Sequence, residues 1–141
     1  MRIKKFLSGV LATILCLSAV CIPAFADTAE GIVPYSNNVS GTATVFVISS
    51  TGLATVKAEY TGIRGVTSGA VITSQIQKKS GTTWTNVPGG YWSDTISGYR
   101  GSTSHSLQLS SHGTYRAVVV YKVSGSGGAT DVIEQKPEYT W

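Results

Sequence analysis

The feature that most constrains this fold is a two-residue alternation of apolar and polar side chains. Within residues 53–60, side chains that are mainly apolar share one side of an extended chain and polar ones share the other: Ala54, Val56, Ala58 and Tyr60 against Thr55, Lys57 and Glu59. Residues 115–123 alternate in the same way, and Val118 and Val120 make their second face apolar too, which predicts a central strand. After residue 26 no segment keeps a 3.6-residue period, so the sequence predicts strands and no helices.

Short strands of this kind recur along the chain, separated by glycine-rich turns. The predicted strands cover residues 42–48, 53–60, 71–78, 83–87, 91–96, 104–109 and 115–123, and a last strand starts at residues 130–134 and runs toward residues 139–141. Pro88-Gly89-Gly90 is predicted to end one strand, and residues 97–103 to form a flexible connection. Seven or eight such strands predict an all-β fold, either a barrel or, as we expect here, a single antiparallel β-sandwich.

The first 26 residues have the three parts of a helical secretory signal peptide. A basic head, residues 1–5, precedes an apolar run over residues 6–22, and Ala24-Phe25-Ala26 fits signal peptidase, which would cut between Ala26 and Asp27. An uncleaved anchor would need roughly 20 apolar residues without such a cleavage site. We therefore expect a signal peptide (1–26), a leader or linker (27–40) with a short edge strand at residues 32–33, a sandwich domain (41–141), and secretion without a stable membrane anchor.

Removing this segment changes the chemistry of the chain. Both cysteines, Cys16 and Cys21, lie within it, so the remaining domain has no disulfide. Three of the 11 Lys and Arg residues also lie there, which leaves eight basic residues against seven acidic ones. A charge near +1 gives no reason to expect a nucleic-acid partner.

The stretch Ser111-His112-Gly113-Thr114-Tyr115-Arg116-Ala117 resembles the entry to strand F of immunoglobulin-like sandwiches, where a tyrosine hydroxyl bonds back to the chain. Ser111 stands where many such domains have aspartate, Ala117 replaces the second cysteine, and the third strand lacks a central tryptophan. The resemblance therefore implies a disulfide-free immunoglobulin-like or fibronectin III-like sandwich. The whole chain also looks like small secreted proteins of unassigned function in Gram-positive bacteria.

Catalytic and metal-binding patterns are not found in the sequence. The two histidines, His105 and His112, are expected to be exposed at a strand start and in a turn, and no serine lies in a G-x-S-x-G elbow. The acidic residues are scattered, and no cysteine remains as a zinc ligand. We expect no enzymatic activity, no metal and no cofactor.

Binding is the function that the composition favours, and aromatic side chains are its best candidates. Trp84, Tyr91, Trp92 and Tyr99 lie close together among glycines, and exposed rings offer flat faces to sugars or to a partner's apolar surface. The alternative is that Trp84 is the core indole and that Tyr91 or Trp92 caps a sheet edge. A binding role predicts that Trp92 and Tyr99 face solvent.

Two kinds of function remain. The first is a monomeric extracellular binding module for a glycan, a cell-envelope component or a protein. The second is a secreted antibacterial effector, because residues 81–84, residues 101–109 and the terminal Tyr139-Thr140-Trp141 are similar in order to lactococcin-type β-sandwich bacteriocins.

Overall fold

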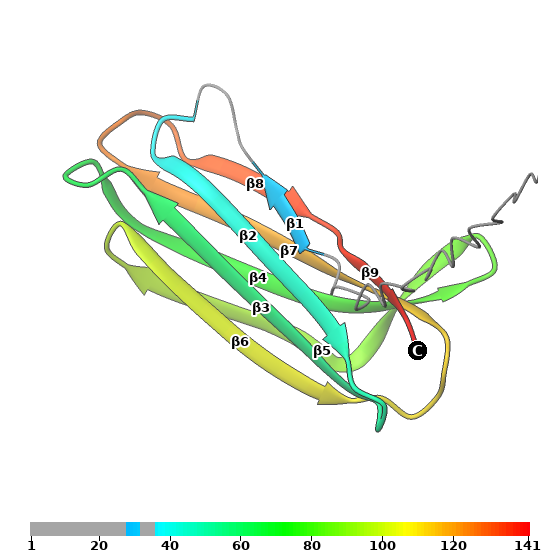
Figure 1. The fold of residues 1–141 in the computed structure, drawn as a ribbon. Coiled ribbons are helices and arrows are strands. Elements are labelled where there is room, and N and C mark those ends of the chain that lie inside the picture. The colour runs from blue at the N-terminus through cyan, green and yellow to red at the C-terminus, as the bar shows by residue number, and fades with distance from the viewer. Residues whose placement is uncertain (1–27, 32–35) are drawn as a thin grey trace, which may run out of the picture.

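The computed structural model describes residues 28–31 and 36–141, which form nine β-strands and no helix. Two antiparallel sheets pack face to face, so the predicted β-sandwich is confirmed (Figure 1). The predicted signal peptide and the cleavage site predicted between Ala26 and Asp27 lie outside the described residues, as does the edge strand predicted at residues 32–33. Within the described part of the chain, no helix has the length and hydropathy to cross a membrane.

Sheet A has four strands in the order β1-β2-β3-β6. These strands are β1 (Thr28–Gly31), β2 (Val39–Ile48), β3 (Leu53–Gly62) and β6 (Arg100–Gln108). The alternation that predicted residues 53–60 as a strand is confirmed, because every second residue of β3 from Ala54 onward is buried. The predicted leader contains β1, which pairs with β2 at the edge of this sheet.

Sheet B has the order β5-β4-β7-β8, with β9 also paired to β7. Its strands are β4 (Thr67–Ser80), β5 (Thr83–Ser97), β7 (Thr114–Gly125), β8 (Asp131–Gln135) and β9 (Glu138–Thr140). The predicted central position of residues 115–123 is confirmed, since β7 pairs with β4 on one side and with β8 and β9 on the other.

The core lies between the two sheets. Its largest fully buried side chains come from both of them: Phe46, Val56 and Tyr60 from sheet A, and Ile72, Ile76, Val119, Tyr121 and Val123 from sheet B. Burying an aliphatic or aromatic side chain of this size contributes about 1.5–3 kcal/mol, so this layer holds the sheets together.

The prediction that Pro88-Gly89-Gly90 ends a strand was wrong. β5 is continuous, and a bulge of four residues, 87–90, lies opposite the single residue Ile76 of β4. Pairing resumes beyond the bulge between Gln77 and Asn86, and β4 extends past the predicted end at residue 78 to pair with β5 as far as Ser80. The tip of this hairpin extends beyond the rest of the sandwich (Figure 1).

The flexible connection predicted for residues 97–103 was also wrong. Only Gly98 and Tyr99 separate β5 from β6, and the left-handed φ of 96° at Gly98 allows the sharp turn. From Arg100 onward the chain already pairs with Thr61 and the rest of β3. The turn therefore carries the chain from the edge of sheet B to the edge of sheet A.

The segment before β2 is fixed by polar contacts to the β7–β8 loop and to the first residue of β8. The Asp131 carboxylate accepts the backbone N–H groups of Asn37, Asn38 and Val39 at 3.0, 2.6 and 3.0 Å. The fully buried Asn38 side chain donates to Ala129 O at 2.9 Å and accepts from Gly127 N at 3.1 Å. These bonds anchor the start of β2 to the β7–β8 loop.

Candidate functional site

The four aromatic side chains singled out in the sequence do not form one cluster. Tyr91 pairs with Gln75, which lies on the outer face of sheet B, whereas its neighbour Trp92 pairs with the buried Ser74 and faces the core. In the bulge, β5 has three residues more than the facing part of β4, and this odd number reverses the inward and outward alternation of its side chains. Trp84, which pairs with Lys79, therefore lies on the outer face. Trp84 is therefore not the core indole, and it shares a sheet face with Tyr91.

This outer face of sheet B presents rings beside amide groups. Tyr91 is 60% exposed. Gln77 Nε2 donates to Asn86 Oδ1 at 2.8 Å, and its own Oε1 accepts from Arg116 Nε at 2.8 Å, so a polar row crosses β5, β4 and β7. We call the surface made by Trp84, Tyr91, Gln75, Gln77 and Asn86 the aromatic platform.

The ring of Trp84 lies across the sheet. Arg116 Cζ is 4.3 Å from its centroid and Lys79 Nζ is 5.7 Å away. Because β4 separates β5 from β7, Trp84 and Arg116 must lean toward each other over β4 to come this close. The Arg116 guanidinium thus packs against the indole on the outer face of the sheet.

Trp92 belongs to a second cluster at the open side of the sandwich, between β5 and β6. Its ring stacks on His105 with centroids 4.9 Å apart and planes 5° from parallel. His105 Nε2 lies 2.7 Å from Asp94 Oδ2, and the two side chains are 24% and 32% exposed. The expectation of an exposed His105 was wrong, because this histidine is half-buried between the sheets.

Tyr99 lies in the β5–β6 turn, away from the platform. Arg64 donates to its hydroxyl at 3.0 Å, and the guanidinium carbons of Arg64 and Arg100 lie 5.2 and 4.8 Å from its ring centroid. The ring is half-buried by these contacts, so neither Trp92 nor Tyr99 is a freely exposed ring.

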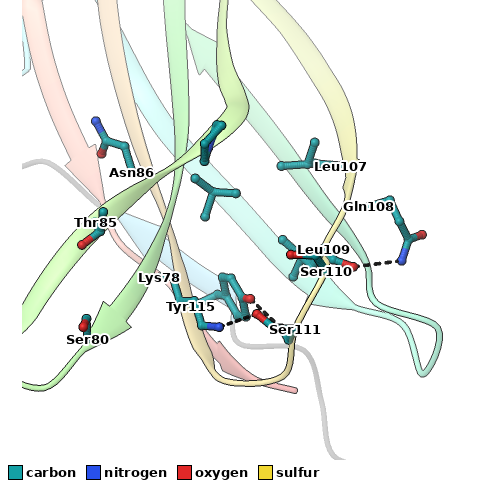
Figure 2. A pocket seen from close by; sticks show the side chains of 12 residues that line it. Lys78, Ser80, Thr85, Asn86, Leu107, Gln108, Leu109, Ser110, Ser111 and Tyr115 are labelled. Carbon is teal, nitrogen blue, oxygen red and sulfur yellow. Dashed lines mark hydrogen bonds between the residues drawn. The ribbon is translucent and has the colours of Figure 1, made fainter.

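A groove of about 530 Å³ opens on the inner side of the β4–β5 hairpin (Figure 2). The hairpin and its bulge form one wall, and the end of β6 with the β6–β7 loop forms the other. Twelve residues line the groove: Lys78, Ser80, Thr85, Asn86, Val87, Pro88, Leu107, Gln108, Leu109, Ser110, Ser111 and Tyr115. Sequence reasoning missed this groove because it depends on the bulge that separates the hairpin from the sandwich.

Other residues that could take part in catalysis or metal binding contact neighbouring side chains instead. His112 stacks on Trp141 with centroids 4.0 Å apart, and Trp141 packs against the core. Among residues 28–31 and 36–141, no three His, Cys, Asp or Glu side chains gather where they could hold a metal ion.

One missed feature was accessible from the sequence. The alternation that turns Leu107 inward also turns His105 inward, because the two positions have the same parity on β6. Its partner Asp94 could not have been chosen from the sequence, since it lies on a strand of the other sheet. Comparison of the chain with protein-family models, with curated proteins and with solved structures finds no match.

Proposed function

We propose that this protein is a secreted, non-catalytic binding module of immunoglobulin-like or fibronectin III-like type, and that it binds a glycan through the aromatic platform. The observation that carries the proposal is the placement of Tyr91, 60% exposed, on the same sheet face as Trp84. Secretion rests on the signal-like residues 1–26 of the sequence.

The strand order supports an immunoglobulin-like type. With β2 as strand A, sheet A contains A-B-E as β2-β3-β6, and sheet B contains C-F-G as β4-β7-β8. β5 pairs with β4, as an added C′ strand does. Tyr115 Oη donates to Ser111 O at 2.6 Å, four residues upstream, which is the hydrogen bond expected of a tyrosine corner.

The chemistry of the platform favours a sugar chain over an apolar protein surface. The C–H faces of sugar rings pack on aromatic rings, and sugar hydroxyls exchange hydrogen bonds with amides such as those of Gln75, Gln77 and Asn86. The Arg116–Gln77–Asn86 row is already hydrogen-bonded, so its amides are held in place before a ligand arrives. A valine stripe, Val118, Val120 and the exposed Val132, continues the face over β7 and β8.

The proposal is tested by binding of the purified protein to cellulose, chitin, xylan and peptidoglycan. We expect saturable binding to at least one of them, and a loss of about tenfold in affinity for Tyr91→Ala and for Trp84→Ala, equivalent to about 1.4 kcal/mol per ring. The matched control is Tyr99→Ala, which removes a ring at the other end of β5 and should leave binding unchanged.

Two results would overturn the proposal. One is the absence of saturable binding to all four polymers. The other is binding that the Tyr91 and Trp84 substitutions leave intact, or that Tyr99→Ala weakens equally. Circular dichroism of each variant separates loss of the platform from loss of the fold.

A further inference from the structure

We infer that the groove beside the hairpin is a second binding site, and that it takes a small organic carboxylate with an apolar body. The site lies on the inner face of the β4–β5 hairpin, whereas the rings of the aromatic platform lie on the outer face; the two surfaces share one residue, Asn86, which none of the test variants changes. The inference is therefore independent of the proposed glycan binding, and different variants test it.

The first argument is the fixed position of one positive charge. Lys78 Nζ donates to Ser111 Oγ at 2.5 Å and lies 5.4 Å from the centroid of the Tyr115 ring (Figure 2). Its stem passes close to the backbone of Gly113, where a Cβ would come to 2.9 Å from Lys78 Cε. The ammonium is thus held in one place, and Ser111 accepts only one of its three N–H groups.

The second argument is the lack of a counter-charge in the lining. The twelve lining residues, all in the described part of the chain, include no aspartate or glutamate. An ammonium at the wall of a partly apolar cleft attracts an anion more strongly than one in open water does, because the surroundings screen the charge less. The positive charge of Lys78 therefore favours the binding of an acidic ligand in the groove.

The third argument is the apolar surface opposite this charge. Leu107 and Leu109 lie across the groove from the hairpin strands (Figure 2). Val87 and Pro88 of the bulge also line the groove. A volume of about 530 Å³ is within the range of small-molecule sites. A carboxylate on Lys78 would leave the rest of the ligand to pack on these side chains.

A serine next to a lysine can also act as a nucleophile and its base, but that chemistry needs a lysine that has lost its proton, which deep burial favours. Lys78 is only half-buried and borders the open groove. The arrangement therefore fits a fixed positive charge better than a base.

The test uses two carboxylates, octanoate and N-acetyl-leucine, with octanol and N-acetyl-leucinamide as uncharged controls. In amide-resolved NMR titrations of the purified protein, we expect saturable shifts at Ser110, Ser111 and Val87, with each acid binding about tenfold or more tightly than its control. Tighter binding of octanoate would identify free alkanoic acids as the ligand class, and tighter binding of N-acetyl-leucine would identify peptide C-termini.

The decisive variant is Lys78→Met, which keeps the stem and removes the charge. It should abolish the preference for acid over control while the rest of the amide spectrum stays unchanged. Ser111→Ala keeps the charge and removes its anchor, so it should weaken octanoate binding less than Lys78→Met does. The inference fails if the acids shift no groove signals at millimolar concentration, or if Lys78→Met binds octanoate as wild type does.

Discussion

The Tyr121 hydroxyl lies 2.6 Å from Thr44 Oγ1 and thereby joins the two sheets through the centre of the core. Tyr121 belongs to β7 of sheet B and Thr44 to β2 of sheet A, and both side chains are fully buried. The same hydroxyl donates to Ala43 O at 2.8 Å. A phenol in this position is stabilising only while it keeps its proton.

Alkaline pH should therefore destabilise the fold. Burial raises the pKa of Tyr121 to about 12, whereas an unfolded tyrosine titrates near pH ~10. The unfolded chain loses this proton first, so the stability is fully present below about pH 10 and falls by about 2–3 kcal/mol as pH rises toward 12. Urea unfolding measures the loss when it is followed from about pH 9, one unit below the pKa of the unfolded chain, to about pH 12, the pKa in the folded protein.

Tyr121→Phe is the control for that titration. It should lower the free energy of unfolding at neutral pH but flatten its dependence on alkaline pH. Some slope should remain, because burial also raises the pKa of Tyr60. An unchanged slope in Tyr121→Phe would contradict the assignment.

Thr103→Val should stabilise the protein. Thr103 Oγ1 is buried and, among the described residues, has no hydrogen-bond partner. Replacing the hydroxyl by a methyl group therefore removes a desolvation cost that no hydrogen bond offsets. We expect a gain of up to about 1 kcal/mol in urea unfolding. The matched change Thr44→Val removes a hydrogen-bonded hydroxyl and should instead lower the free energy of unfolding by about 1–2 kcal/mol. A lower free energy of unfolding in both variants would contradict the difference expected between a bonded and an unbonded hydroxyl.

Asp131→Ala should be among the most damaging changes outside the core. It deprives three backbone N–H groups of their acceptor at the start of β2, with an expected cost of about 3 kcal/mol. Glu134→Ala, on the same strand, removes an exposed carboxylate bonded to Lys136 and should cost less than about 1 kcal/mol. Equal melting temperatures for the two variants would contradict this account.

Asp94 and His105 should show measurable energetic coupling. They lie on the edge strands of opposite sheets, so their contact ties the open side of the sandwich. A double-mutant cycle with Asp94→Asn and His105→Gln should give a coupling of about 1 kcal/mol. The exposed Glu134–Lys136 pair is the control, and a coupling no larger than that of this pair would show that the contact adds no stability.

The sequence allowed the strands and the sandwich to be predicted wherever the information was local. β2, β3 and β7 bury every second side chain, and that periodicity is visible without knowing the partner strand. β6 was predicted too short because its first residues, Arg100 to Thr103, are glycine- and serine-rich and become a strand only by pairing with β3.

The candidate site was less predictable because it depends on register. Whether Trp84 faces the core or the solvent is decided by the odd number of extra residues in the β5 bulge, and the bulge exists because β4 continues beside it. Nor could the sequence show that Lys78 is hydrogen-bonded to Ser111. The two residues are 33 positions apart, and only the fold places the β6–β7 loop beside the hairpin.

The β5 bulge also has a consequence for the association of separate molecules. β5 is an edge strand of sheet B, and an uninterrupted edge of 15 residues would offer a neighbouring chain a long row of free N–H and C=O groups. Residues 87–90 break that row, and Pro88 has no N–H to donate. An incoming strand can match the residues before the bulge or those after it, and never both in one register, so the bulge that opens the groove also protects the sheet against fibre-like growth.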